Sequence, residues 1–388
     1  MKLIRITTVP QSLRGLLKGQ LKFMKSQGFE VIGVSSSGEA LDDVHINEGV
    51  QTVAINMTRT ISPLSDLKSL IQLIKFFKKE KPEIVHTHTP KAGLLGMLAA
   101  KIVGVPYRLH TVAGMPLTVA TGFKRLLLNK VEVLTYACAT KVYPNSYGLN
   151  EIILENKFTR VSKLKVLGSG SSNGIDTSFF DPELISQDSR TELKKKLGIK
   201  TDEFVFIFVG RLVKDKGINE LVSAFIKLDK ESLIKPKLLL VGPLENELDA
   251  LQEETLCLIN NHSNIISVGY QKDVRPYFAI SDVLVFPSYR EGFPNVVMQA
   301  GAMGIPSIVS NINGCNEIIV ENVNGMIIPV RNIEAIFYSM KKIGLDSCYS
   351  NFLRENCRRM IEERYEQKHV WKIILNEYNS LSNKVKLK

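Results

Sequence analysis

Cysteine is scarce in this sequence, and its placement argues against two kinds of stabilisation. The 388 residues contain only five cysteines, which are Cys138, Cys257, Cys315, Cys348 and Cys357. They are scattered and odd in number, and no two of them form a CxxC pair. This usage favours a reducing cytoplasm over a disulfide framework or a cysteine zinc site.

Long apolar runs are also missing. The nearest approach to the roughly 20 residues that span a bilayer is residues 93–105, which Lys101 interrupts. The N-terminal stretch MKLIRITTVP is too short and turns polar too early for a secretory signal, so we expect it to form a first strand. These features predict a cytoplasmic chain without a transmembrane helix.

Positive charge is in excess, and all of the excess lies in one half. The formal net charge is +11 at pH 7. Residues 1–165 hold 23 Lys and Arg against 11 Asp and Glu, whereas the rest of the chain holds 27 against 28. A basic half implies an anionic partner, which is a nucleic acid, an acidic membrane surface or a phosphorylated substrate. No nucleic-acid-reading motif or aromatic platform accompanies the charge, so we expect no nucleic-acid partner.

The length and the alternation of patterns predict a two-domain α/β protein. A chain of 388 residues is too long for one ordinary core. Short aliphatic or β-branched runs alternate with helical patterns, which predicts parallel sheets covered by helices. The expected strands are residues 2–7, 30–34, 84–88, 107–111, 204–209, 237–241, 265–268, 283–286 and 307–309.

The two domains are expected to be doubly wound and Rossmann-like. The segment GSGSSNGIDTSFFDP, residues 168–182, is rich in Gly, Ser and Asn and is predicted to join them. We expect domains over residues 1–165 and 166–365, with a C-terminal helix over about 366–388 that packs back on the first. A cleft between two such domains, at the carboxyl ends of their strands, is the expected ligand site.

A first candidate site follows the strand expected at residues 204–209. In FVGRLVKDKG, Arg211 and Lys216 stand five residues apart, flanked by Gly210 and Gly217. Two cations beside a helix N-terminus, at the carboxyl end of a strand, form a suitable cradle for a diphosphate. The segment has no GxxxxGKS or GxxxxGKT motif and is therefore not a P-loop. Two solvated loop cations are the alternative interpretation.

A second candidate site has the same design. It is SYREGFPNVVMQAGAMGIP, residues 288–306, which follows the expected strand 283–286 and enters a helix near Asn295. Pro294 suits a helix start, and Gly292 permits a close approach of the backbone. Glu291 can accept two hydroxyl hydrogen bonds from a sugar. A surface acid before a helix is the alternative.

Together these stretches resemble the retaining GT-B glycosyltransferases of family 4. That family is characterised by an acid-x7-acid segment and by an Arg/Lys pair after the first strand of its C-terminal domain. The matching stretches are GRLVKDKG (210–217) and EGFPNVVMQAGAMGIPSIVS (291–310). Similar stretches also occur at residues 84–116, 173–182, 269–288 and 314–319. The resemblance implies an acceptor-binding N-terminal domain and a C-terminal domain that binds a nucleotide sugar.

The resemblance also implies roles for particular residues. Arg211 and Lys216 would bind the donor diphosphate, and Glu291 would hydrogen-bond the transferred sugar. The same pocket would be lined by Gly210, Gly292, Phe293, Pro294, Asn295 and Gln299. Gln299 replaces the second acid of the family, which usually accepts from the ribose hydroxyls. An amide keeps a carbonyl acceptor, whereas a carboxylate in essential proton transfer could not be replaced in this way.

Three histidines raise the question of a metal site. His86 and His88 alternate on one expected strand and so face the same side, and His110 lies on the next. No Cys or acid completes a ligand set with recognisable spacing, and the chain has no Asp-x-Asp pair. We therefore expect neither a metal nor a cofactor. By the resemblance, His110 is a catalytic-site residue that faces the donor sugar across the cleft, and His86 and His88 are packing or supporting residues.

The start of the chain holds the expected acceptor side. Thr8, Val9, Pro10 and Arg14 follow the first strand, where this fold places acceptor contacts. The adjoining residues 12–26 carry Arg14, Lys18, Lys22 and Lys25 on one helical stripe beside an apolar stripe of Leu13, Leu17, Leu21 and Met24. A basic amphipathic helix on an anionic leaflet and a core-facing helix with a solvated rim fit equally well.

The sequence therefore predicts a hexosyl- or N-acetylhexosaminyltransferase that uses a nucleotide-diphosphate sugar and retains the anomeric configuration. The stretches SYREGFPNVV and NGCNEI look like those of bacterial surface-polysaccharide enzymes, which build capsule and O-antigen. We accordingly expect a lipid-linked acceptor, a sugar on undecaprenyl diphosphate, and a peripheral location on the anionic inner face of the membrane. A nucleotide-sugar 2-epimerase of the same fold is the alternative.

Overall fold

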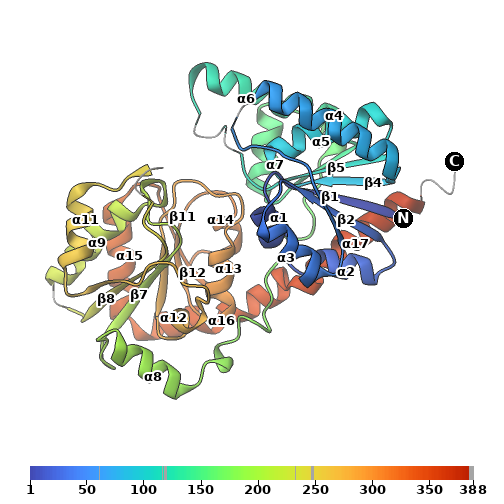
Figure 1. Ribbon diagram of the computed structural model, residues 1–388. Coiled ribbons are helices and arrows are strands. Elements are labelled where there is room, and N and C mark those ends of the chain that lie inside the picture. The colour runs from blue at the N-terminus through green and yellow to red at the C-terminus, as the bar shows by residue number, and fades with distance from the viewer. Residues whose placement is uncertain (61, 116, 118–119, 232, 246–248, 384–388) are drawn as a thin grey trace. The chain divides into compact units, whose positions relative to one another are not determined.

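The computed structural model describes residues 1–383 except for residues 61, 116, 118–119, 232 and 246–248 (Figure 1). Its contacts divide the chain into two compact units. Unit 1 comprises Met1–Gly174 with Lys368–Lys388, and unit 2 comprises Ile175–Gln367. The chain thus leaves unit 1 inside the Gly- and Ser-rich segment 168–182 and returns to it at the start of the last helix.

Unit 1 is built on a six-stranded parallel sheet with the order β3-β2-β1-β4-β5-β6. β1 lies at its centre, with Leu3 in register with Val31 on β2 and with Ile84 on β4. The strands are β1 (Lys2–Ile6), β2 (Glu30–Ser35), β3 (Gln51–Ala54), β4 (Ile84–Thr87), β5 (Tyr107–Val112) and β6 (Lys141–Pro144).

Helices cover both faces of this sheet. Ile4 and Ile6 of β1 point into a core that contains Leu73 of α4, whereas Leu3 points into a second core with Tyr378 of α17. This alternation follows from the two-residue period of a strand. The helices are α1 (Pro10–Leu16), α2 (Gln20–Ser26), α3 (Glu39–Glu48), α4 (Pro63–Glu80), α5 (Pro90–Val103), α6 (Gly122–Cys138), α7 (Tyr147–Glu155), the short η2 (Val161–Lys163) and α17 (Gln367–Asn383).

Unit 2 is built on a second six-stranded parallel sheet, with the order β12-β11-β10-β7-β8-β9. Its strands are β7 (Phe204–Val209), β8 (Pro236–Val241), β9 (Ile265–Ser267), β10 (Val283–Phe286), β11 (Ser307–Ser310) and β12 (Gly325–Ile328). Its helices are η3 (Pro182–Leu184), α8 (Gln187–Lys196), η4 (Lys214–Lys216), α9 (Ile218–Glu231), α11 (Glu253–Asn261), α12 (Arg275–Ala279), α13 (Asn295–Ala302), α14 (Cys315–Ile318), α15 (Ile333–Leu345) and α16 (Ser347–Tyr365). Across the described ranges, no helix has both the length and the apolar character needed to cross a bilayer.

The two sheets share one topology. When unit 2 is read from β7 as its first strand, both sheets have the order 3-2-1-4-5-6 of a doubly wound fold. The order reverses between β1 and β4 in unit 1, and between β7 and β10 in unit 2. The predicted fold class of two Rossmann-like units is therefore confirmed. In such sheets ligands bind at the carboxyl ends of the strands that flank the reversal.

Three strands were not expected from the sequence, and all three lie at sheet edges. They are β3, β6 and β12, whose sequences are QTVA, KVYP and GMII. Each has only four residues, and an edge strand has a neighbour on one side only, so it needs a less apolar run than a central strand. The expected central strands β7 and β10 have the predicted bounds.

Of the two interpretations of residues 12–26, the core-facing one is confirmed and the membrane-facing one is wrong, although the segment does not form a single helix. The segment forms two helices, α1 and α2, which are separated at Leu17–Gly19. Gly19 adopts a φ of 78°, and a Cβ atom there would lie 2.5 Å from Trp371 of α17. The apolar stripe of Leu13, Leu17, Leu21 and Met24 is buried in the core beneath α17 and cannot face a membrane.

Two glycines in this segment should respond oppositely to alanine. Gly15 lies inside α1, and a Cβ atom added to it would meet no other atom within 4 Å, so Gly15→Ala should stabilise the fold by roughly 0.5–1 kcal/mol. Gly19→Ala should destabilise it by more than about 1 kcal/mol, because a left-handed residue would press against Trp371. Urea unfolding of both variants measures this, and equal shifts would contradict the assigned helix break.

Candidate active site

The loop after β7 is shaped by two close backbone approaches. A Cβ atom on Gly242, after β8, would lie 1.8 Å from the carbonyl oxygen of Gly210, so only glycine allows the two strand ends to meet there. Gly217 has a φ of 72°, and a Cβ atom on it would lie 2.2 Å from the carbonyl oxygen of Pro287. The turn that carries Lys216 is therefore pressed against the loop that follows β10.

The loop after β10 is fixed from its other side as well. The Asn313 side chain donates a hydrogen bond of 2.6 Å to the carbonyl oxygen of Glu291. A Cβ atom on Gly314 would come within 2.6 Å of the carbonyl oxygen of Gly292. These contacts hold the backbone around Glu291 in place before α13 begins at Asn295.

Lys216 and Glu291 form an ion pair at the reversal point of the sheet. The Lys216 ammonium group bonds Oε1 of Glu291, and the Ser288 hydroxyl donates to the same oxygen over 2.9 Å. Both charged side chains are 16% exposed, and the Lys216 Nζ atom lies 5.6 Å from the centre of the Phe286 ring. The structure thus brings together two residues that the sequence placed 75 positions apart. One charge of each sign is held where an anionic, hydroxylated ligand is expected.

Arg211 is placed differently from Lys216. Its guanidinium bonds Glu245 over 3.0 Å, and its side chain is 43% exposed. A surface pair of this kind contributes about 0–1 kcal/mol. A diphosphate can therefore take over the guanidinium at little cost in stability.

The remaining residues predicted for the donor side lie along the start of α13. Phe293 is buried against the Tyr365 ring, at 5.3 Å between ring centres. Pro294 is buried at the N-cap position, Asn295 is exposed, and Gly292 is half-buried. Gln299 is half-buried, and within the described part of the chain its side chain makes no hydrogen bond. Among the described residues, its amide is therefore uncommitted.

The predicted acceptor-side residues lie at the reversal point of unit 1. Thr8 is buried and ties the ends of β1 and β4 together, because its N–H donates to the Thr89 hydroxyl over 2.9 Å. Pro10 is buried at the start of α1, and Val9 is half-buried. Arg14 is exposed and bonds Asp43 over 2.6 Å.

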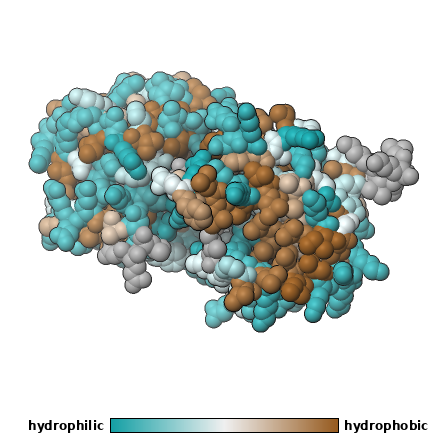
Figure 2. Space-filling model, turned by 90° about the horizontal axis from the view of Figure 1, so that it is seen from above, coloured by the Kyte–Doolittle hydropathy of each residue, from teal (hydrophilic) through white to brown (hydrophobic). Residues whose placement is uncertain are grey.

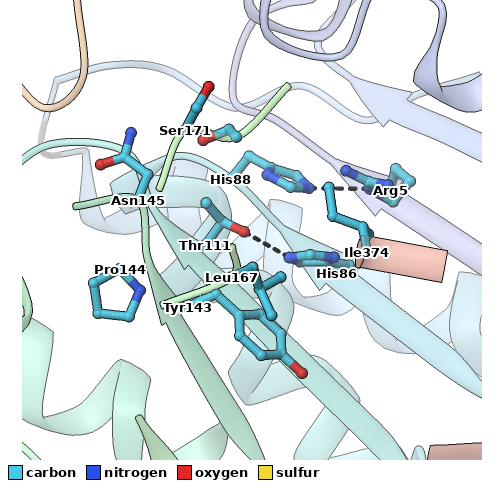
Figure 3. A pocket seen from close by; sticks show the side chains of 11 residues that line it. Arg5, His86, His88, Thr111, Tyr143, Pro144, Asn145, Leu167, Ser171 and Ile374 are labelled. Atoms are coloured by element: carbon cyan, nitrogen blue, oxygen red, sulfur yellow. Dashed lines mark hydrogen bonds between the residues drawn. The ribbon is translucent and has the colours of Figure 1, made fainter. Parts of the chain in front are cut away.

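The sequence analysis missed Arg5, which forms a buried polar cluster with His86 and His88 next to these residues. Figure 3 shows Arg5, His86 and His88 around a small cavity beneath the end of the sheet. Arg5 is fully buried, and its Nε atom donates to Nε2 of His88 over 3.0 Å. His86 bonds the hydroxyls of Tyr378 and Thr111, at 2.6 and 2.7 Å. The signal for this cluster was an arginine inside an otherwise apolar strand, LIRI.

His110 lies in the same sheet and is neutral at ordinary pH. It is buried on β5, where its Nδ1 atom lies 2.8 Å from the Thr87 hydroxyl. Burial lowers the pKa of His110 to about 4. Burial also lowers the pKa values of His86 and His88 well below the ordinary value. His110 can therefore exchange hydrogen bonds with a ligand at pH 7 without contributing a positive charge.

This burial predicts a pH dependence of stability. Below about pH 6.5 the unfolded chain binds a proton at His110 that the folded chain rejects until about pH 4. Stability is therefore fully present above pH 6.5 and falls as the pH falls toward 4. The His110 contribution between pH 7 and about pH 4.5 is about 2 kcal/mol. Urea unfolding of the wild type and of His110→Gln at both pH values should show a smaller loss for the variant, and equal losses would contradict the assignment.

The histidines are not arranged as a metal site. Among the residues that the structure describes, no group of three or more His, Cys, Asp or Glu side chains could hold a metal ion. Both ring nitrogens of His86 are occupied by hydroxyl groups, and Nε2 of His88 by Arg5. The packing or supporting role expected for these two rings stays a prediction.

Comparison with known proteins finds relatives over nearly the whole chain. Residues 6–146, in unit 1, match the family model described as Glycosyl transferase 4-like, and residues 189–367, in unit 2, match Glycosyl transferases group 1. The chain is 34% identical to the capsular polysaccharide biosynthesis glycosyltransferase CapM of Staphylococcus aureus, over 98% of this chain and 97% of that protein.

A second relative and a solved structure extend the comparison. The chain is 30% identical to the UDP-Gal:alpha-D-GlcNAc-diphosphoundecaprenol alpha-1,3-galactosyltransferase of Escherichia coli, over 88% of this chain and 87% of that protein. Its fold is similar to the crystal structure of a glycosyltransferase from Rickettsia africae, with a TM-score of 0.81 over 98% of both chains. At 20% identity, that likeness concerns the fold alone.

Proposed function

Because this chain belongs to the family 4 glycosyltransferases with the GT-B fold, we propose that it moves a sugar from a nucleotide diphosphate to a lipid-diphosphate-linked sugar. The family membership shows that the chain is a glycosyltransferase. The proposal concerns its donor, its acceptor, the stereochemistry of transfer and its location in the cell. The transferred group is a hexose or an N-acetylhexosamine, and the anomeric configuration is retained. The product belongs to a bacterial surface polysaccharide.

The observation that carries the donor half of this proposal is the Lys216–Glu291 pair. Lys216 and Arg211 supply positive charge at the carboxyl end of β7, and the leaving diphosphate gains negative charge as the glycosidic bond breaks. Charges that are in place before the reaction stabilise this transition state without reorganisation. Glu291 accepts hydrogen bonds from the sugar hydroxyls, and Gln299 accepts from the ribose.

The chemical step requires no enzyme nucleophile. The bond between the anomeric carbon and the diphosphate oxygen breaks, and a bond to the acceptor oxygen forms on the same face. The acceptor proton passes to an oxygen of the leaving diphosphate, so charge and atoms balance. His110, neutral at pH 7, exchanges a hydrogen bond with the donor sugar.

The acceptor half rests on charge and on relatives. Residues 1–165 carry the whole positive excess, as expected for a chain that meets a lipid diphosphate at an anionic surface. The E. coli relative is named for a diphosphoundecaprenol acceptor. A peripheral location on the cytoplasmic face of the membrane follows from such an acceptor. No metal or cofactor is required in this scheme.

A 2-epimerase is the second candidate, and the relatives do not favour it. The family models and the two named relatives are all transferases. An epimerase would convert a sugar nucleotide with no acceptor present. Incubation with each sugar nucleotide alone should therefore leave the sugar configuration unchanged.

The proposed function is tested by screening nucleotide-sugar donors against lipid-linked acceptors. A panel of UDP-, GDP- and dTDP-sugars is incubated with undecaprenyl-diphosphate-linked GlcNAc or GalNAc, and lipid products are detected by mass spectrometry. We expect one donor to extend one acceptor. The absence of a lipid product from every donor–acceptor pair would contradict the acceptor assignment.

A further inference from the structure

The structure exposes an apolar surface on unit 1 that is distinct from the buried stripe of α1 and α2. On α4 the exposed residues Leu64, Leu67 and Ile71 are spaced at i, i+3 and i+7, so they share one side of the helix. On α6 the exposed residues Phe123 and Leu126 share one side in the same way. Leu64 and Phe123 are 87% and 82% exposed. We call these five residues the α4–α6 face.

The two helices belong to one layer. α5 packs against both α4 and α6 on the same side of the sheet. Figure 2 shows hydrophobic side chains gathered on the side of the molecule seen from above, where Figure 1 has α4, α5 and α6. Monomeric proteins rarely expose apolar side chains in contiguous groups of this kind without a partner.

The face lies at the edge of unit 1 that holds the predicted acceptor residues. In a parallel sheet each crossover helix starts at the edge where the strands end. Leu64 and Leu67 stand in the first turns of α4, and Phe123 and Leu126 in the first turns of α6. Lys91, at the start of α5 just after β4, bonds Asp66 of α4 over 2.7 Å. Four of the five residues of the α4–α6 face, all but Ile71, therefore lie toward the edge at which β1 and β4 end.

The surrounding charge is almost wholly positive. α4, α5 and α6, all of whose residues are described, carry nine basic residues, which are Lys68, Lys75, Lys78, Lys79, Lys91, Lys101, Lys124, Arg125 and Lys130. Their three acids are not free at the surface. Asp66 pairs with Lys91, Glu80 pairs with Lys2, and Glu132 is buried. Lys75 and Lys78 continue the apolar side of α4 into its second half.

We propose that the α4–α6 face is the surface by which this protein rests on an anionic lipid bilayer. Leu64, Leu67, Ile71, Phe123 and Leu126 enter the boundary between headgroups and acyl chains, and the basic side chains around them meet anionic headgroups. Apolar area and positive charge together give the binding strength of such interfacial helices. The inference deepens the proposed function and rests on it for its biological purpose.

A bilayer fits these features better than a protein partner does. A face between two copies of this chain would bring Lys68, Lys124 and Arg125, which stand near the starts of α4 and α6, against the same residues of the other copy, which is unfavourable. A bilayer offers anionic charge around an apolar interior, and thereby complements both parts of the surface. It also places the strand ends of unit 1 next to the headgroup region, where the diphosphate of a lipid-linked acceptor lies.

The experiment measures vesicle binding of the full chain. The wild type, the double variant Leu64→Glu with Phe123→Glu, and a control are sedimented with phosphatidylglycerol–phosphatidylethanolamine vesicles and with phosphatidylcholine vesicles. The control is Leu233→Glu with Phe352→Glu, which changes two residues of unit 2 that are 56% and 50% exposed. We expect the wild type and control to bind the anionic vesicles and the double variant to bind about tenfold more weakly or less.

Further measurements distinguish the possible outcomes. Circular dichroism and thermal unfolding must show that the double variant folds as the wild type does, and Lys124→Glu with Lys130→Glu serves as a second variant that should weaken binding to anionic vesicles selectively. Equal vesicle binding by wild type and folded double variant would overturn the proposal. A wild-type dimer in light scattering that the double variant loses, with no vesicle binding, would assign the face to a second copy instead.

The vesicle result is independent of the proposed activity. With a short-chain, water-soluble diphosphate acceptor, the double variant should transfer sugar as fast as the wild type. If the wild type itself used no lipid-linked acceptor, the proposed function would fail while the binding surface stood. If transfer occurred normally but neither form bound vesicles, the surface would fail while the function stood.

Discussion

Lys216→Ala should abolish nearly all sugar transfer while leaving the fold intact. The Lys216 ammonium is held by Glu291 at the end of β7, where the leaving diphosphate is expected. Removal of one preorganised group that stabilises developing charge typically lowers kcat by about 10²–10³. The turn itself is fixed by the backbone of Gly217 against Pro287, so it does not depend on the lysine side chain. Initial rates with a radiolabelled donor measure the loss.

The matched control for this variant is Lys214→Ala. Lys214 is an exposed lysine in the same short helix, η4, two residues before Lys216. Its replacement removes the same charge from the same turn and should leave the rate within about twofold, since surface charges contribute little. Equal effects of the two substitutions would mean that general charge, and not the position of Lys216, supports the reaction.

Glu291→Gln should be the second most damaging single change. The carboxylate accepts from Ser288 and Lys216, and a sugar hydroxyl would share its acceptor capacity. An amide replaces one acceptor oxygen by a donor and leaves the Lys216 charge without its partner. We expect kcat/KM to fall by about 10²-fold, the size of losing a charged hydrogen bond in a site built for it. Steady-state kinetics over a range of donor concentrations measures this loss.

Gln299→Glu is the informative contrast to Glu291→Gln. Gln299 has no side-chain hydrogen bond within the described part of the chain, so a carboxylate there breaks none. Because an amide and a carboxylate both offer an acceptor oxygen to a ribose hydroxyl, activity should stay within about threefold. A large loss at Gln299 with little loss at Glu291 would reverse the roles assigned to the two ends of this segment.

The local sequence pattern correctly predicted the strands that consist of a continuous, buried apolar run. FVFIFV and VLVF were recognisable as β7 and β10 because central parallel strands are buried on both faces. β3, β6 and β12 were not, since an edge strand needs neither length nor an unbroken apolar sequence. The break between α1 and α2 depends on Trp371, which is distant in sequence. The helical periodicity of residues 12–26 therefore predicted one continuous helix.

The candidate site was predictable as a set of residues but not as an arrangement. GRLVKDKG and the segment from Ser288 could be assigned to strand ends, and both do follow strands that flank the reversal point. The direct bond between Lys216 and Glu291 depends on which strands are neighbours, which no local pattern contains. Arg5 is similar, because its contact with His88 appears only when β1 and β4 are paired.

The α4–α6 face shows the same limit of sequence-based prediction. Residues 12–26 and residues 66–79 are both amphipathic and basic, and nothing in their periodicity says which side faces the core. The apolar side of α1 and α2 is covered by α17, the C-terminal helix, which is distant from them in sequence. On α4 and α6, by contrast, Leu64 and Phe123 stay 87% and 82% exposed.

The measurement that tests the central claim most directly is the anomeric configuration of the first product. The purified enzyme is given its α-linked nucleotide-sugar donor and a lipid-diphosphate-linked sugar acceptor, and the configuration of the new linkage is read by proton NMR. The account predicts an α-glycosidic linkage to the acceptor sugar, formed with retention. A β-linkage, formed by inversion, would contradict the proposed same-face substitution at the anomeric carbon.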